Sequence, residues 1–257
     1  MAVEGRCGGP SHQRWPELMV EFNGGQIGEA LRWCLPARAA GPLIGIGNFL
    51  MGERELRILR SVCTKGTVAV DVGANYGAYS FWLGRIYERV VAFEPVEECA
   101  RFLENAYPKV DTIRAALGDR NGNALLEIDE RDGKIVTTEA RIRDDSRTST
   151  GAPRLREVSM RTLDSYKFED VGFIKIDVEG HELAVLRGAE GTLEAFRPSL
   201  IIECEERHRE GALDSVREFL GRFGYSCYVI VGKKLVRVED LMYLRKYSTV
   251  NFVFVSP

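Results

Sequence analysis

The sequence lacks the features that mark several large classes of protein. Its 257 residues include six cysteines, but no two of them are spaced as the C-x-x-C pairs of structural zinc sites. It has no run of five or more Lys or Arg, and 35 basic against 38 acidic residues leave a net charge of −3. This balance gives no overall attraction for nucleic acid or anionic lipid, so both kinds of partner are disfavoured.

Long hydrophobic segments are missing as well. The N-terminal residues carry an early acid and no apolar core, so they do not resemble a secretory signal. The longest weakly apolar stretch, residues 39–52, contains Pro42 and several glycines and is shorter than the roughly 20 residues of a membrane-spanning helix. We therefore expect a reduced, cytoplasmic protein with no integral membrane segment, whose oligomeric state the sequence does not indicate.

What the sequence contains is enough apolar material for a full core, since 45% of its residues are hydrophobic and 28% are charged. Residues 1–52 are interrupted by Gly and Pro, which predicts an irregular N-terminal cap or extension with a hairpin. Apolar residues at three- and four-residue steps in 53–63 predict a helix. This helix opens the main domain, residues 53–257.

In the main domain, short β-branched and apolar runs alternate with helical patterns. Such runs are typical of strands covered by helices on both faces, and the alternation predicts an α/β fold with a doubly wound, mostly parallel sheet of seven strands. The last two runs lie too close in sequence for helical crossovers throughout, so an antiparallel edge strand is expected. The predicted strands are 67–72, 89–94, 109–115, 171–178, 199–205, 225–231 and 249–255, and the helices between them are 76–87, 97–107, 182–196 and 212–223.

Residues 116–160 form an excursion that a simple crossover does not need. Asn121 and Gly122 predict a hairpin turn, because this pair favours the backbone of a two-residue β-turn. Residues 129–157 are dense in charges of both signs. Long charged loops usually lie on the surface, so a solvated loop is favoured over a functional lid.

The segment VAVDVGANYGAYSF predicts a nucleoside pocket. It is a buried strand that ends near Asp71, followed by a loop and a helix whose first N–H groups point at the same place. Gly73 and Gly77 would let a ligand approach the backbone. Tight packing of strand against helix would explain either glycine alone, but the glycines together with Glu94 favour the pocket. The Asp71 carboxylate would repel a pyrophosphate and attract a cation, so a positively charged nucleoside fits best.

Glu94 ends the next predicted strand, 23 residues after Asp71. An acid at about this interval reaches the ribose hydroxyls in dinucleotide-binding folds. Pro95 follows it and stiffens the turn. Glu94 is also open to a simpler interpretation as an acid at a helix N-terminus.

The segments VAVDVGANYGAYS, FEP, RTLDSY and FIKIDVEGHELAVLRGA together resemble the FkbM family of S-adenosylmethionine-dependent methyltransferases, over about residues 53–255. The resemblance implies a class I methyltransferase (Rossmann-like) sheet and an enzyme that methylates oxygen on sugars or natural products. It also implies a cofactor site. The residues assigned to this site are Asp71, Gly73, Ala74, Asn75 and Gly77 at the methionine and ribose end, Glu94 and Pro95 at the ribose, Ala116, Leu117 and Asp119 at the adenine, and Asp177.

KIDVEGHE places several ionisable groups at the carboxyl end of the fourth predicted strand, where open parallel sheets bind ligands. An alcohol needs a base or a metal to remove its proton, and His181 is the obvious base. Lys175 and Asp177 are candidates for the same site, or they form a purely structural ion pair. Glu179 and Glu182 are candidates too, or they simply cap a helix.

A divalent metal held by Asp177, Glu179 and Glu203 is the alternative to His181, and metal-free catalysis is favoured. The acceptor is expected to be a small molecule or a glycan. A sugar hydroxyl of a glycan, glycolipid or glycosylated metabolite is the first choice, and a carboxylate or polyketide hydroxyl is the second. A nicotinamide-dependent oxidoreductase and a non-catalytic nucleoside-binding domain remain as competing functions.

Overall fold

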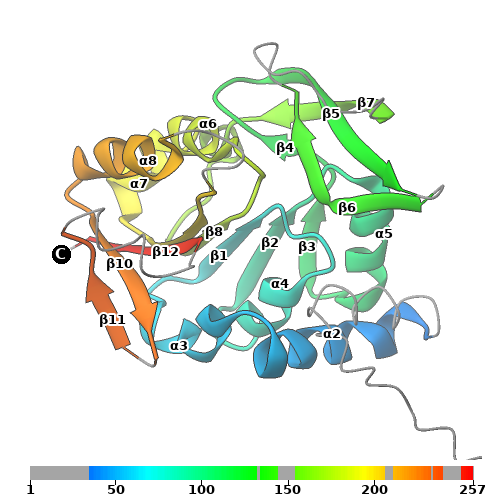
Figure 1. Cartoon of the computed structure of the whole chain (residues 1–257), viewed down its shortest axis with the longest axis horizontal. Helices are drawn as coiled ribbons and strands as arrows, with labels where there is room; N and C mark the ends of the chain where they lie inside the picture. Colours follow the sequence, from blue (N-terminus) through cyan, green and yellow to red (C-terminus); the bar gives the residue numbers. More distant parts are fainter. Residues whose placement is uncertain are drawn as a thin grey trace, which may run out of the picture.

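The computed structural model describes residues 35–131, 134–143, 154–205, 211–232, 234–239 and 250–256. Its centre is a twisted eight-stranded sheet in the order β11-β10-β12-β9-β8-β1-β2-β3 (Figure 1). The pairs β3-β2, β2-β1, β1-β8 and β8-β9 are all parallel. The strands are β1 (Val68–Val72), β2 (Arg89–Phe93), β3 (Val110–Ile113), β8 (Val171–Ile176), β9 (Ser199–Glu203), β10 (Ser226–Val231), β11 (Lys234–Arg237) and β12 (Asn251–Val255).

The predicted doubly wound, mostly parallel sheet is confirmed. β12 runs antiparallel between β9 and β10, as the short connection at the end of the chain requires. The prediction of seven strands is one short, because β11 pairs antiparallel with β10 and forms the outer edge. All four residues of β11 are exposed, so this edge strand has no apolar run that a search for buried strands would detect.

Helices cover both faces of the sheet, and alternate residues of each strand divide between the two cores. Val68 and Val70 pack in the core under α6 (Glu182–Arg187), α7 (Glu190–Phe196) and α8 (Ala212–Gly221). Ala69 belongs to the opposite core, which it shares with residues of α3 (Leu59–Val62) and α4 (Ala78–Leu83). α5 (Glu97–Ala106) connects β2 to β3. None of the described helices is long and apolar enough to cross a membrane.

Two predicted helices differ from the structure. The single helix expected over 182–196 is split into α6 and α7 around Gly188, where a Cβ would lie 2.0 Å from the carbonyl oxygen of Gly118. The helix expected over 53–63 is a short 3-10 helix, η1 (Arg54–Arg57), followed by the single turn of α3.

The expectation of irregular structure with a hairpin is wrong for residues 37–51, which form the helix α2 (Ala37–Met51) despite Pro42 in its interior. Packing explains the result. A Cβ at Gly41 would lie 2.9 Å from Ala106, and one at Gly45 would lie 2.4 Å from the Phe81 ring. The glycines that suggest a loop are therefore the positions where α2 approaches α5 and α4. Residues 1–34 of the predicted cap lie outside the described residues.

The excursion forms a second sheet in the order β4-β7-β5-β6, which Figure 1 shows above the carboxyl ends of β1 to β3. Its strands are β4 (Ala116–Leu117), β5 (Gly122–Arg131), β6 (Lys134–Ile142) and β7 (Arg154–Arg161). The predicted hairpin at Asn121 is wrong, because β4 and β5 both pair with β7 and the chain reverses between Arg131 and Lys134. Asn121 instead accepts a hydrogen bond from the N–H of Thr162 through its side chain.

The preferred interpretation of 129–157 as a solvated loop is also wrong for the described part of that segment, which lies mostly in strands. The charges are compatible with a sheet because they pair along it. Arg141 lies 3.2 Å from Glu127, and Arg156 lies 2.8 Å from Glu98 on α5. On the inner face, Leu126 and Ile128 are buried against α5 and α2. Residues 144–153 lie outside the described residues.

Candidate active site

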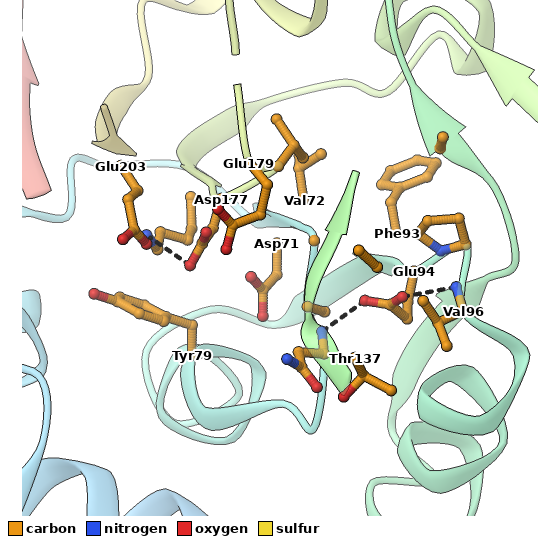
Figure 2. Close-up of a pocket in the computed structure, with 18 of the residues that line it drawn as sticks. Asp71, Val72, Tyr79, Phe93, Glu94, Val96, Thr137, Asp177, Glu179 and Glu203 are labelled. Atoms are coloured by element: carbon orange, nitrogen blue, oxygen red, sulfur yellow. Dashed lines mark hydrogen bonds and ion pairs between the residues drawn. The ribbon is translucent and has the colours of Figure 1, made fainter. Parts of the chain in front are cut away.

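A cavity of about 380 Å³ opens at the carboxyl ends of β1, β2, β8 and β9. Its volume lies within the roughly 300 to 1,000 Å³ of small-molecule sites. Figure 2 shows that it has two different ends, with Glu203, Asp177 and Tyr79 at one and Phe93, Glu94 and Val96 at the other. We call these the acid end and the Glu94 end.

The glycines of the loop after β1 are explained by protein contacts. Gly73 has φ of 75°, and a Cβ there would lie 1.8 Å from the carbonyl oxygen of Asp177. Gly77 has φ of 78°, and a Cβ there would lie 2.5 Å from the ring of Tyr107. Gly73 lines the cavity together with Ala74. Gly77 instead begins α4 and faces Tyr107, so the structure gives it a packing role.

Glu94 joins this loop to the end of β2. One carboxylate oxygen accepts from the N–H of Asn75 at 2.8 Å, and the other accepts from the N–H of Val96 at 2.8 Å. Burial raises the pKa of Glu94 to about 7, although these two hydrogen bonds act to lower it. A carboxylate has about four acceptor positions, so each oxygen keeps one for a further donor.

Asp71 lies in the cavity wall at the centre of the site and is 2% exposed. Its Oδ2 accepts a hydrogen bond of 2.6 Å from the hydroxyl of Ser80 in α4. Burial raises its pKa to about 6, while the hydrogen bond from Ser80 and the charge of Lys175 act to lower it. A cation bound in the cavity would favour the ionised form of this carboxyl group.

Lys175 is the centre of the acid end. It points from β8 into the cavity wall, is 1% exposed, and lies 3.5 Å from Asp177. Its ammonium donates to the side-chain oxygen of Asn251 at 2.9 Å and lies 5.0 Å from the ring centre of Tyr79. Burial acts to lower the pKa of Lys175, but the surrounding carboxylates, above all Asp177, raise it beyond its ordinary value.

Two further carboxyl groups complete the acid end. Burial, the neighbouring charge of Asp177 and a hydrogen bond with that carboxyl group raise the pKa of Glu203 well above its ordinary value. Burial raises the pKa of Glu53 to about 7. Among the described residues, no group of three or more His, Cys, Asp or Glu is arranged to hold a metal ion. A metal at Asp177 and Glu203 stays a prediction.

The rest of the KIDVEGHE segment turns from β8 into α6. Glu179 and His181 both line the cavity. Gly118 is the residue directly after β4, and a Cβ there would lie 3.1 Å from Nε2 of His181. Glu182 is buried and accepts from the N–H of Gly180 at 2.7 Å, so its side chain holds the turn before α6 and does not cap the helix.

The Glu94 end is mostly apolar and is lined by the second sheet. Phe93, Ala116 and Leu117 lie in its wall, as do Leu126 and Ile142. The predicted adenine contacts at 116 and 117 are thus part of the cavity. Asp119 is not brought to it, because its carboxylate pairs with Arg120 at 3.2 Å on the surface. Pro95 lines the cavity beside Glu94.

Sequence reasoning did not find every residue of the cavity wall. It missed Glu53 and Tyr79 at the acid end, Asn48 and Ile44 from α2, and Thr137 from the second sheet. The sequence could have indicated Tyr79, because this residue lies in the first turn of the helix that follows the glycine loop. RTLDSY lies elsewhere, where Asp164 accepts hydrogen bonds from the N–H groups of Gly191 and Thr192 in α7.

Comparison with known proteins gives the family. A family model for the methyltransferase FkbM domain matches residues 71–227, which is more than half of the chain. No curated protein matches the chain. A solved structure of an FkbM methyltransferase from Methylobacillus flagellatus KT is similar, with 18% identity and a TM-score of 0.48, over 89% of this chain and 58% of that one.

This chain therefore spans less than two thirds of the Methylobacillus protein. An O-methyltransferase from Bacillus cereus, solved in complex with SAH, is similar at 16% identity and a TM-score of 0.42, over 91% of this chain and 89% of that one. The match to the family model, together with the sheet order and the site at its carboxyl edge, shows that the chain belongs to the FkbM family of S-adenosylmethionine-dependent methyltransferases.

Proposed function

We propose that this methyltransferase acts on a hydroxyl group, with a sugar hydroxyl of a glycan, glycolipid or glycosylated metabolite as the preferred acceptor. The observation that carries the proposal is the acid end of the cavity. It sets Glu203, a buried carboxyl group with a raised pKa, beside a second carboxyl group, Asp177, and an ammonium group, Lys175. A hydroxyl both donates and accepts hydrogen bonds, so it matches this set. A carboxylate acceptor has no hydroxyl proton for Asp177 to accept, so it is disfavoured.

The residues at the cavity fit S-adenosylmethionine. The free acceptor positions of Glu94 suit the two ribose hydroxyls, and the apolar wall at Ala116 and Leu117 suits the adenine. Asp71 and its acidic neighbours favour the positive charge of the sulfonium. When bound, the cofactor supplies an activated methyl group.

The chain's own contribution is to orient the acceptor and to take its proton. Lys175 would donate a hydrogen bond to the acceptor oxygen and Asp177 would take the hydroxyl proton. The remaining lone pair of that oxygen would stay free to accept the methyl group as the sulfur of the cofactor leaves. The second sheet forms part of the cavity wall and would limit the access of water to a bound acceptor.

The position of His181 changes the preferred base. Because its Nε2 lies beside Gly118, next to the segment proposed for the adenine, the ring is better placed to line the nucleoside end than to reach the acceptor. We therefore favour Asp177 as the base and keep His181 as the alternative.

Mass spectrometry tests the function. The full chain is incubated with S-adenosylmethionine and matched acceptors, namely sugars with free hydroxyls and the same sugars carrying a carboxylate as the sole free group. We expect S-adenosylhomocysteine and a hydroxyl-linked methyl group on the sugars. Methylation confined to carboxylates would contradict the proposal. EDTA added to one arm tests the metal alternative, since loss of activity that Mg²⁺ restores would support it.

A further inference from the structure

The outward face of α2 is apolar although it is exposed. Residues 39, 43, 46 and 50 recur at three- and four-residue steps and share one side of the helix. Leu43 is 44% exposed, Ile46 42% and Leu50 61%, and Met51 follows at 60%. Of the ten exposed large hydrophobic side chains in the described part of the chain, five lie between residues 35 and 51. The four that belong to α2 form one stripe, which we call the α2 stripe (Leu43, Ile46, Leu50 and Met51).

The exposed charges of α2 and the residues that follow it have one sign. Between residues 35 and 61, the exposed charged side chains are Arg38, Arg54, Arg57 and Arg60. The two acids of that range point inward, since Glu55 is buried and Glu53 lines the cavity. The chain as a whole carries a net charge of −3, so this basic region opposes its average.

The α2 stripe cannot turn inward, because the opposite face of α2 is fixed. Tyr107 donates a hydrogen bond to the carbonyl of Gly41 at 2.8 Å, and the indole of Trp82 donates to that of Gly45 at 2.9 Å. The same face supplies Ile44 and Asn48 to the wall of the cavity. The stripe is therefore a stable surface on the back of a helix that forms the active site.

We propose that the α2 stripe and its arginines dock this protein on an anionic membrane surface. An apolar helix face with Arg nearby is typical of helices that lie in the lipid interface. There the apolar side chains insert among the acyl chains, and the basic side chains bind the anionic headgroups. A second copy fits less well. A two-fold dimer through this face would bring the four arginines of one copy toward those of the other. The inference goes beyond the proposed reaction and does not depend on the acceptor.

Vesicle flotation of the full chain tests the proposal. We expect the chain to float with vesicles of phosphatidylcholine and phosphatidylglycerol, to float much less with phosphatidylcholine alone, and to be released by 0.5 M salt. The double variant Leu43→Asp/Leu50→Asp should lower the partition coefficient at least tenfold. Leu235→Asp/Val236→Asp, which adds the same charges to exposed apolar positions of β11, should leave it unchanged. Calorimetry of cofactor binding confirms that each variant is folded.

A second variant separates the two parts of the surface. Arg54→Gln should lower binding to anionic vesicles about fivefold at low salt. Arg57 is avoided because it donates to the carbonyls of Phe49 and Leu50 at the end of α2. Failure of the full chain to float would overturn the proposal, and so would equal flotation of all variants. If the chain is instead a dimer and Leu43→Asp/Leu50→Asp converts it to a monomer, the α2 stripe is a dimer interface and the membrane proposal is wrong.

Discussion

The two ends of the cavity are built in different ways. At the Glu94 end, backbone N–H groups from the loop after β1 and from the start of α5 hold the carboxylate, and apolar side chains surround it. At the acid end, side chains hold one another, with Lys175 among Asp177, Asn251 and Tyr79. Backbone donors are fixed by the fold, whereas a cluster of side chains changes with each substitution. This contrast suits a constant cofactor at one end and chemistry on a variable acceptor at the other.

The largest effect should come from the proposed base. Asp177→Asn removes the proton acceptor, so we expect turnover to fall by about 10² to 10⁴ while cofactor affinity changes less than tenfold. Steady-state rates and calorimetry measure the two quantities. His181→Ala is the comparison variant, because His181 is the alternative base. If His181→Ala loses more turnover than Asp177→Asn, the acid end does not carry the chemistry and the comparison fails.

The free energy of unfolding should fall as the pH rises, because several buried acids have raised pKa values. Glu53 and Glu94 have pKa values raised to about 7, and Asp71 to about 6, above their values in an unfolded chain. Between its pKa in the unfolded chain and its pKa in the folded chain, each group binds more protons in the folded state. Its contribution to stability is therefore highest below the unfolded-state pKa and is lost as the pH rises through the folded-state pKa. Urea unfolding should show a loss on the order of 6 kcal/mol from pH 5 to pH 8, the sum over these three groups.

Single substitutions divide this pH dependence between the two ends. Glu53→Gln and Glu94→Gln should each flatten the profile in part. A flat profile for the unaltered protein would mean that these carboxyl groups ionise as freely in the fold as in water.

Glu94 tests the cofactor end alone. Glu94→Ala removes charge-assisted hydrogen bonds worth roughly 1.5 to 3 kcal/mol, so cofactor affinity should fall by about 10- to 150-fold. Calorimetry with S-adenosylhomocysteine measures the change. Glu97→Ala is the control, because Glu97 is an exposed acid of the first turn of α5 that pairs with Arg101. Equal losses in both variants would rule out the ribose contact.

The smallest expected effect concerns Asn251, which positions Lys175. Asn251→Ala removes a hydrogen bond worth roughly 1 kcal/mol, so turnover should fall about fivefold with cofactor affinity unchanged. Asn105→Ala removes a comparable side-chain bond on the exposed face of α5 and should leave turnover unchanged. No difference between the two variants would mean that Lys175 keeps its position without Asn251.

The sequence allowed the sheet and the cofactor end to be predicted because both have local patterns. The strand before Asp71, the loop after it and the acid at Glu94 each follow from residues close in the chain. α2 could not be predicted in this way, because the contacts that stabilise it come from α4 and α5. Asn251 is 76 residues from Lys175, and its role depends on the insertion of β12 beside β9. The second sheet was missed because its strands carry charges that only pairing explains.

Gly73 links the two ends of the cavity through the main chain. The space that its missing side chain leaves is filled by the carbonyl oxygen of Asp177, so the nucleoside loop and the acid end touch where β1 and β8 lie side by side. For protein engineering, the two strands form one indivisible module. A graft of the loop alone would meet a foreign β8 main chain, and it should work only when residues 68–77 and 171–181 are transplanted together.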